Sequence, residues 1–133
     1  MPEIERYAAR LLIRASSGRV LMLRVAPSFR DAFWVTPGGG LDDGETMLDA
    51  VARELYEEVG RDDLPIGACV STRHVEYEWE DWHVRQHEQT FLEEAPNEFK
   101  AKVLHPDEEP IVGWAWFSAE ECERSPMTCT PTA

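Results

Sequence analysis

The sequence predicts a protein of mixed α and β structure, in which one mixed β-sheet is flanked by helices. The chain has 133 residues, which is enough for one domain with its own core. Short apolar runs bounded by turn signals fill most of it, whereas residues 46–59 have the periodicity of a helix. Helix and strand segments follow one another without strict β-α-β alternation, so a mixed sheet is favoured over a doubly wound parallel one.

The first part of the predicted sheet is a hairpin. Tyr7–Ala15 and Val20–Val25 are apolar runs, and Ser16–Arg19 between them is a turn signal. Phe33–Val35 is a short strand-like segment that ends before a glycine-rich loop at residues 37–40.

The clearest helix is expected over Thr46–Val59. Thr46 and Asp49 have the spacing of a capping box, and Gly60 suits the position just after a helix. A helical wheel assigns the core-facing stripe to Leu48, Val51, Ala52, Leu55 and Val59.

The second half of the chain predicts three more strands. Ile66–Tyr77 and His83–Leu92 are two of them, with a turn near Glu80. Glu93–Pro110 is expected to be a polar loop, and Trp114–Phe117 the last strand.

The chain is expected to end its fold in a short helix. Ser118 and Glu121 have the spacing of a second capping box. We expect a single domain over residues 1–124, followed by a loose tail over residues 125–133, which is polar and contains proline.

Composition limits the kinds of partner. The formal net charge is −13, from 13 Lys and Arg against 26 Asp and Glu, and such a surface repels a nucleic-acid polymer or an anionic membrane. No apolar run approaches the roughly 20 residues of a membrane helix, and the N-terminus lacks the pattern of a signal peptide. A cytoplasmic protein that binds a small phosphorylated ligand is therefore expected.

Three acids of the predicted helix fall close together. Glu54, Glu57 and Glu58 have spacings of three and four residues, at which like charges repel, and Arg53 can pair with Glu57 but cannot neutralise all three. Carboxylate oxygens are the ligands that Mg²⁺ or Mn²⁺ prefers. A metal site and a solvated acidic face are equally compatible with the helix alone.

The glycines before the helix add to the metal interpretation. Gly38, Gly39 and Gly40 allow a tight turn and a close approach to a ligand, and a loop that enters a helix can present N–H groups to phosphate. The loop is neither a P-loop nor a G-x-G-x-x-G motif. Glycines alone more often make only a turn.

The joint spacing of these residues is specific. Gly39 is followed after five residues by Glu45, and after seven more by Arg53-Glu54-Leu55-Tyr56-Glu57-Glu58-Val59-Gly60. This resembles the Nudix box, G-x5-E-x7-R-E-U-x-E-E-x-G-U with U apolar, and eight of its nine defined positions match. The final apolar position is Arg61 here, beyond the helix stop and clear of the acids. The resemblance implies an α/β/α sandwich and a hydrolase of the pyrophosphate bond in nucleoside diphosphates linked to another group.

The resemblance also implies roles for the matching residues. Glu57 and Glu58 would be the principal ligands of Mg²⁺ or Mn²⁺, and Glu54 either a third ligand or the group that orients the attacking water. The Gly38 carbonyl would complete the metal shell. Arg53 would hold the carboxylates, supported by Glu45. Gly39 and Gly40 would contact the substrate.

Residues outside the box provide weaker candidates. A further acid often joins such sites, and Glu109 is the first candidate, with Glu88 as the alternative. His87 and Arg85 share one face of a strand with His83, so a role toward substrate is considered, while a zinc site at the two histidines is disfavoured. Aromatic residues that could stack on a base are Phe29, Phe33, Trp79 and Trp82.

Two hypotheses of function remain. One is a metal-dependent hydrolase acting on a nucleotide derivative, and the other is a regulatory module that binds a nucleotide without cutting it. The complete carboxylate set favours the hydrolase. The sequence leaves open the substrate, the number of metal ions and whether the chain forms a homodimer.

Overall fold

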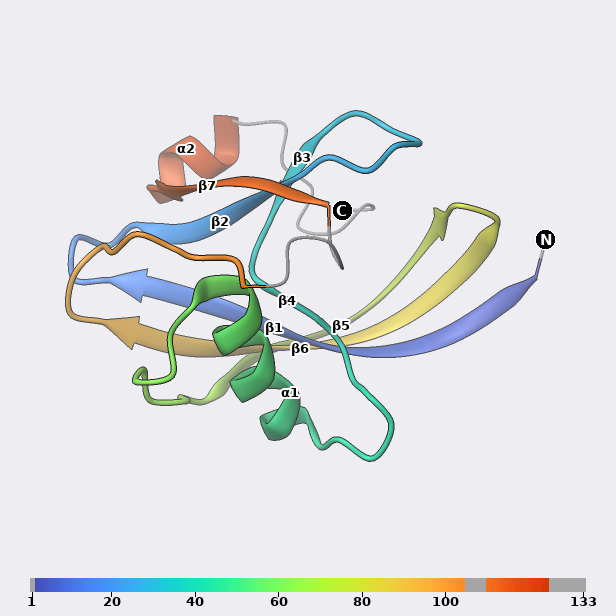
Figure 1. The fold of residues 1–133 in the computed structure, drawn as a ribbon, viewed down its shortest axis with the longest axis horizontal. Coiled ribbons are helices and arrows are strands. Elements are labelled where there is room, and N and C mark those ends of the chain that lie inside the picture. The colour runs from blue at the N-terminus through green and yellow to red at the C-terminus, as the bar shows by residue number, and fades with distance from the viewer. Residues whose placement is uncertain (1, 105–109, 125–133) are drawn as a thin grey trace.

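The computed structural model describes residues 2–104 and 110–124. Seven strands and three helical segments occur in these residues (Figure 1). In chain order they are β1 (Glu3–Ala15), β2 (Val20–Val25), β3 (Phe33–Val35), β4 (Gly38–Gly40), α1 (Met47–Glu54), η1 (Leu55–Val59), β5 (Cys69–Trp79), β6 (Trp82–Ala95), β7 (Ile111–Phe117) and α2 (Ala119–Arg124). The segment η1 is a single π-helical turn that continues α1.

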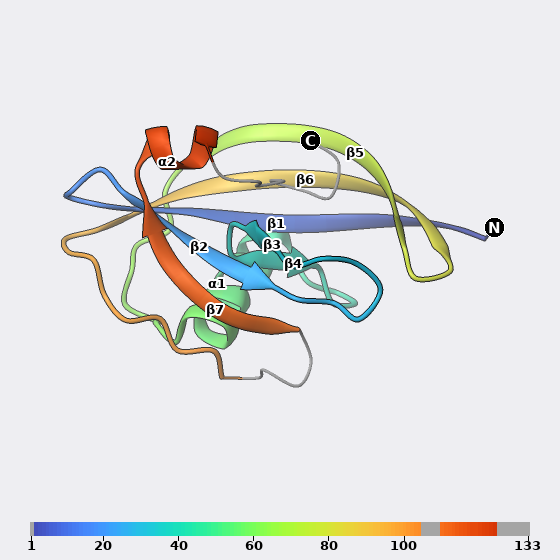
Figure 2. The ribbon, with the colours of Figure 1, turned by 90° about the horizontal axis from the view of Figure 1, so that it is seen from above.

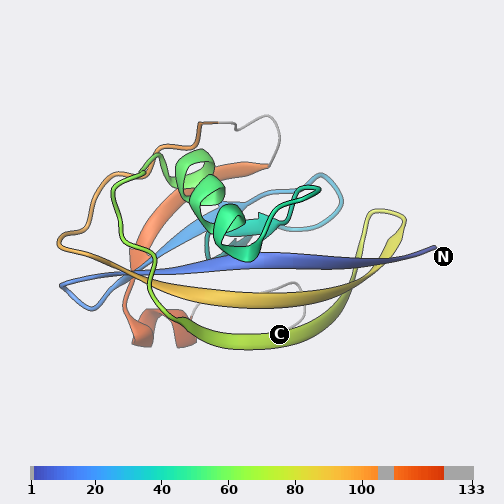
Figure 3. The ribbon, with the colours of Figure 1, turned by 90° about the horizontal axis from the view of Figure 1, so that it is seen from below.

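The strands form one mixed sheet, as predicted. The order is β3-β2-β1-β6-β5, while β4 pairs with β1 and β7 pairs with β2. β1 and β6 run parallel from the pair Glu3–His83 to the pair Ala15–Ala95, and the other pairings are antiparallel. In Figure 2 the β2, β3 and β7 part turns away from the long β1, β5 and β6 part. The helices α1 and α2 lie on opposite sides of the sheet (Figures 1 and 3), so the predicted layers are confirmed.

The main core lies between the sheet and the α1–η1 helix. Strand β1 contributes Leu11 and Ile13, and the helix contributes Val51 and Leu55, all with at most 3% of their surface exposed. A second cluster joins β2 to β3 and consists of Leu23, Val25, Phe33 and Val35. Burial of these side chains is the main term that favours folding.

The helix begins as the sequence predicts and ends differently. Thr46 Oγ1 accepts from the Asp49 N–H at 3.1 Å, and the Asp49 carboxylate accepts from the Thr46 N–H, which completes the capping box. Gly60 ends the helix at φ 81°, a conformation that favours glycine. The last turn is π-helical rather than α-helical.

The predicted core-facing stripe of the helix needs correction. Leu48 and Ala52 are exposed. The buried residues are Ala50, Val51, Glu54, Leu55, Glu58 and Val59. The buried positions repeat every four residues, and in the last turn the wider π-helical geometry keeps Glu58 and Val59 on the face of Glu54 and Leu55. Two of the three acids therefore belong to the buried face.

Several strand boundaries also differ. β5 begins at Cys69 rather than at Ile66. Before this strand, the Gly67 N–H donates to the Leu92 carbonyl outside the regular strand pairing. β6 continues to Ala95 because its pairing with β1 continues that far. Glu93, which was expected to begin a polar loop, is therefore a buried strand residue.

The last helix, α2, confirms its capping box. The Ser118 Oγ accepts from the Glu121 N–H at 3.1 Å, and the Ser118 N–H donates to Glu121 Oε1 at 2.8 Å. Within residues 2–104 and 110–124, no helix has the length and apolar character needed to span a membrane.

Candidate active site

The three glycines of β4 bring the backbone against the helix that follows. The Gly38 N–H donates to Glu58 Oε1 at 2.9 Å. A methyl group on Gly39 would lie only 2.4 Å from Glu54 Oε2, so glycine leaves room for that carboxylate. The Gly40 carbonyl accepts from Arg53 Nη2 at 2.9 Å. The glycine strand thus contacts two acids and the arginine of the helix.

The π turn arranges the two buried acids. The Gly60 N–H donates to the Leu55 carbonyl, five residues back, at 3.1 Å. Residues four apart are separated by about 40° around an α-helix axis, and a wider turn reduces this angle. Glu54 and Glu58 consequently share one face, with 4% and 5% of their surfaces exposed. Glu57 is more exposed, at 26% of its side chain.

Arg53 connects the acids. Its Nε and Nη2 donate to the two carboxylate oxygens of Glu45 at 2.7 and 2.9 Å. Its Nη1 donates to Glu54 at 2.9 Å and to Glu57 at 3.3 Å, and its Nε lies 3.2 Å from the Asp42 carboxylate. The hydrogen bond from Arg53 lowers the pKa of Glu45 and raises the pKa of Arg53. The two expected contacts of Arg53, with Glu57 and with Glu45, are both present.

The donor chemistry around Glu58 fits a hard divalent cation. Glu54, Glu57 and Glu58 supply carboxylate oxygens and Gly38 supplies a carbonyl, and oxygen ligands suit Mg²⁺ and Mn²⁺. The Gly38 carbonyl accepts from Arg10 Nη1 at 3.3 Å. In the part of the chain that the structure describes, no three His, Cys, Asp or Glu side chains converge closely enough to hold a metal ion. The residues are therefore suitable in kind, and Arg53 binds two of them, Glu54 and Glu57.

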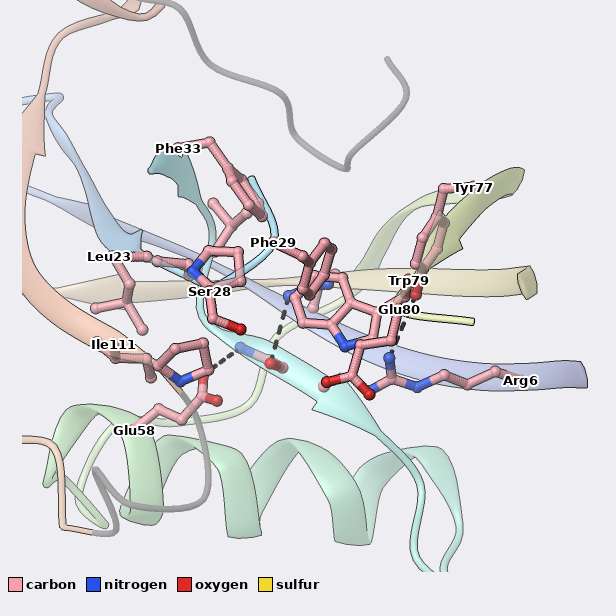
Figure 4. A pocket seen from close by; sticks show the side chains of 18 residues that line it. Arg6, Leu23, Ser28, Phe29, Phe33, Glu58, Tyr77, Trp79, Glu80 and Ile111 are labelled. Carbon is pink, nitrogen blue, oxygen red and sulfur yellow. Dashed lines mark hydrogen bonds between the residues drawn. The ribbon is translucent and has the colours of Figure 1, made fainter. Parts of the chain in front are cut away.

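A cavity of about 590 Å³ lies next to Glu58 (Figure 4). Figure 4 shows Glu58 and Arg6 on the side of the cavity nearer the helix, and Phe29 close to Trp79. The rings of Phe29 and Trp79 meet edge to face, with centroids 4.7 Å apart. Other residues that line it include Arg10, Gly38, Gly39, Leu23, Val25, Phe33, Val35, Tyr77 and Ile111. A cavity in which apolar and aromatic side chains face a few convergent polar groups is typical of a ligand site.

Some of the predicted aromatic and glycine residues line this cavity, and others do not. Phe29, Phe33 and Trp79 line it. Trp82 is exposed at the tip of the β5–β6 hairpin and is not among the lining residues. Gly39 lines the cavity, whereas Gly40 does not.

Glu88 lies beside the cavity without lining it. It is buried, and its carboxylate binds three neighbours: Arg73 Nε at 3.1 Å, Arg10 Nε at 3.4 Å and the Gln86 amide. Through Arg10 it is linked to the Gly38 carbonyl. Its contacts suit a residue that positions Arg10 rather than one that touches a ligand.

The structure does not bring Arg85 and His87 to this site. Residues of β6 alternate between the two faces of the sheet, so these two side chains lie on the face opposite to Gln86 and Glu88. Neither residue lines the cavity. Their expected role toward substrate in this site is therefore withdrawn. Glu109 lies outside the described residues.

Sequence reasoning missed the two arginines of the cavity. Arg6 and Arg10 belong to β1, four residues apart and on one face. Arg6 Nη1 donates to the Tyr77 hydroxyl at 3.3 Å, and this hydroxyl donates to Gln86 Oε1 at 2.6 Å. The available signal was the presence of two arginines at even spacing within an apolar strand.

Comparison with known proteins agrees with the motif and the fold. A family model described as NUDIX domain matches residues 5–129. The chain belongs to this family. The Nudix resemblance that the sequence indicated is thus confirmed.

Both curated relatives and solved structures are similar to this Nudix domain. An RNA pyrophosphohydrolase of Aliivibrio fischeri (strain MJ11) is 32% identical over 96 residues, which cover 64% of this chain and 56% of the relative. The chain therefore spans little more than half the length of that curated relative. Among solved structures, the MutT protein of Methanosarcina mazei Go1 has a TM-score of 0.73 at 22% identity and covers 96% of this chain and 88% of its own.

A second solved structure gives the same result for the fold. The E. coli dihydroneopterin triphosphate pyrophosphohydrolase has a TM-score of 0.71 at 24% identity, covering 88% of this chain and 84% of its own. At these identities the two structures support the fold of the Nudix domain and nothing finer.

Proposed function

We propose that the chain is a metal-dependent hydrolase that cleaves the pyrophosphate bond of a nucleoside diphosphate linked to another group. One observation carries the proposal: the buried Glu58 lies at a cavity that also contains Arg6 and Arg10. A buried acid next to two arginines can bind a ligand whose phosphates are bridged to the protein by a cation. The family membership and the pyrophosphohydrolase names of its relatives agree with this.

The residues that would hold Mg²⁺ or Mn²⁺ are Glu54, Glu57, Glu58 and the Gly38 carbonyl. When bound, such ions neutralise phosphate oxygens, activate water and stabilise the leaving oxygen. Glu109 remains a candidate for a further ligand. Several oxygen donors are needed because a cation beside a pyrophosphate group retains a full coordination shell.

The chain's own residues would orient the reaction. Arg53 holds Glu54 and Glu57 by hydrogen bonds from one guanidinium, and Glu45 fixes that guanidinium in turn. Glu54 would either complete the metal shell or accept a hydrogen bond from the attacking water. The oxygen of that water forms a bond to phosphorus as the bridging P–O bond breaks, and a nearby carboxylate accepts its proton.

The cavity would bind the nucleoside part and the phosphates separately. Arg6 and Arg10 carry positive charge at its polar end, where bidentate contact with phosphate oxygens is favourable. Phe29 and Trp79 supply aromatic surface for a base. The volume of about 590 Å³ lies in the range of small-ligand sites.

RNA is a second substrate class to be considered, because curated relatives are named RNA pyrophosphohydrolase. The net charge of −13 opposes binding of a long phosphate backbone. We therefore propose a small nucleotide derivative as the substrate and include RNA as a competing outcome.

The test is a substrate panel with and without Mg²⁺ or Mn²⁺. The panel contains nucleoside triphosphates, nucleotide sugars, dinucleotides and a short RNA with a 5′-triphosphate. We expect a small nucleotide to be cleaved at its pyrophosphate bond and cleavage to stop with a chelator. Binding without cleavage of any compound would favour the alternative, a nucleotide-sensing module. Cleavage of the RNA alone would overturn the small-substrate proposal.

The proposal also includes a cytoplasmic location and the division into a domain at residues 1–124 and a tail. That the chain forms a homodimer stays a prediction. Sedimentation of the purified chain would decide the oligomeric state.

A further inference from the structure

Three histidines and two glutamates lie on the sheet face opposite to Glu88. His74 on β5 and His87 on β6 are direct cross-strand partners in the register of the hairpin. Their exposed side-chain fractions are 43% and 37%. His83, on the same face of β6, contacts Glu76 at 2.9 Å. None of these residues belongs to the proposed active site.

The imidazole rings of His74 and His87 approach each other through their Nδ1 atoms. The His74 Nδ1 lies 3.4 Å from the His87 Nδ1. The other ring nitrogens contact carboxylates: the His87 Nε2 lies 3.2 Å from Glu5 Oε2, and the His74 Nε2 lies 3.5 Å from Glu76 Oε2. An ionised carboxylate only accepts hydrogen bonds, so the tautomer in which both rings donate to their carboxylates is the one with the hydrogen on Nε2. Both Nδ1 atoms then have lone pairs directed toward the same space.

The separation of these lone pairs suits a metal ion. Zn²⁺ binds histidine nitrogen at about 2.0–2.1 Å, so two tetrahedral ligands are roughly 3.3–3.4 Å apart. The two Nδ1 atoms lie at 3.4 Å. A cation between them would also remove the repulsion between the two lone pairs.

The surroundings orient His87 in advance. Its ring stacks on Tyr7, with centroids 4.8 Å apart and planes inclined by 22°. Tyr7 lies opposite His87 in the parallel pairing of β1 with β6. A carboxylate on the outer nitrogen of a metal-binding histidine fixes the tautomer and strengthens the ligand, and Glu5 and Glu76 have that position.

We propose that His74 and His87 form a binding site for a divalent transition-metal ion such as Zn²⁺, Ni²⁺ or Cu²⁺. The two Nδ1 atoms are the protein ligands, and water completes the shell. No third His, Cys, Asp or Glu side chain in the described residues completes a preformed group of ligands, so this is an open, two-histidine site. It is separate from the oxygen site proposed at Glu58, because imidazole selects Zn²⁺, Ni²⁺ and Cu²⁺ whereas carboxylates suit Mg²⁺.

The test is titration of the untagged chain with Zn²⁺ in excess Mg²⁺, which keeps the carboxylates around Glu58 occupied. We expect one Zn²⁺ to bind, and His74→Ala and His87→Ala each to weaken that binding at least tenfold. His83→Ala is the matched control, because His83 lies on the same face and contacts the same Glu76. This variant should bind within twofold of the wild type.

Electron paramagnetic resonance of one equivalent of Cu²⁺ supplies a second measurement. The wild type should show coupling to two nitrogens, and each single variant at most one. Thermal unfolding verifies that the variants are folded, as expected for substitutions of exposed side chains on β5 and β6. Unchanged affinity in both His74→Ala and His87→Ala, equal loss in His83→Ala, or Cu²⁺ without two nitrogen ligands would overturn the proposal.

Discussion

The α1–η1 helix and the C-terminal end of β6 both bury glutamate in this Nudix domain, and only the helix acids have partners in the described residues. Glu54 and Glu58 on the α1–η1 helix are 4% and 5% exposed and have defined partners, among them Arg53 and the Gly38 N–H. Glu93 on β6 is 0% exposed, and neither of its carboxylate oxygens has a hydrogen-bond partner in the described residues. Burial raises the pKa of Glu93 to about 7.

The difference shows what partners do for a buried acid. Hydrogen bonds and an adjacent guanidinium favour the ionised form of a carboxylate, which is the form that binds metal. Burial alone favours the neutral form and makes ionisation unfavourable. The helix acids have such partners, whereas Glu93, which has none in the described residues, lowers stability whenever it ionises.

The largest expected effect comes from removing charge in the partnered region. Glu58→Gln keeps an oxygen for the Gly38 N–H but loses the negative charge that a metal needs. We expect kcat to fall by about 10³-fold, or about 4 kcal/mol, with Mg²⁺ and the best substrate of the panel. Steady-state kinetics measures this change, and Glu57→Gln should also lose most of the activity.

The matched control is Glu94→Gln, which removes an exposed acid from β6 and should leave kcat unchanged. Thermal unfolding should show that Glu58→Gln remains folded. Full turnover in both Glu57→Gln and Glu58→Gln would disprove the metal assignment.

The next effect concerns the acid without partners. The pKa of Glu93 is raised from an ordinary 4.5 to about 7 in the folded chain. Below pH 4.5 the acid is neutral in both states, and between 4.5 and 7 the unfolded state ionises first. The free energy of unfolding therefore falls by on the order of 3 kcal/mol between pH 4.5 and 7 because of Glu93, and this loss persists above pH 7.

Glu93→Leu should remove this pH dependence. We expect the variant to be more stable than the wild type at pH 8, and the difference to shrink by pH 4.5. Urea unfolding at both pH values measures it. Glu94→Gln, one residue further along the strand, should keep the wild-type profile from pH 4.5 to 8 apart from its own small change. A Glu93→Leu profile parallel to the wild type would show that Glu93 has partners in solution.

The smallest expected effect moves a partnered acid without removing it. A methyl group in Gly39→Ala would meet Glu54 Oε2, the end of a flexible side chain, so the carboxylate must shift. We expect about a tenfold loss of kcat, or about 1.4 kcal/mol, with little change in stability. Gly113→Ala is the control, since its new methyl group would lie 3.9 Å from Arg24. An equal loss in both variants would contradict this role of Gly39.

The sequence predicted the local features well. The capping boxes at Thr46 and Ser118, the stop at Gly60 and the turn near Glu80 are all present, because each depends on residues within a few positions. The spacing of Gly39, Glu45 and Arg53 likewise identified the contacts around the helix.

The features that sequence reasoning missed depend on long-range pairing. The β1–β6 pairing places Arg6 beside Gln86 and Arg10 beside Thr90, which no local pattern indicates. The same pairing extends β6 through Glu93. Strand alternation, by contrast, already predicts that His87 and Glu88 lie on opposite faces of the sheet, so the two side chains cannot contact one ligand. The π turn depends on competition between two acceptors for the Gly60 N–H.

The parallel pairing of β1 with β6 also affects how the chain folds during synthesis. Arg14 and Glu94 form an ion pair although they are 80 positions apart. Contacts at such separation form late and slow the folding of a domain. While β6 is still within the ribosome, Leu11 and Ile13 of β1 lack the neighbouring strand that they have in the finished sheet. Strand β1 is thus exposed to aggregation until β6 is complete.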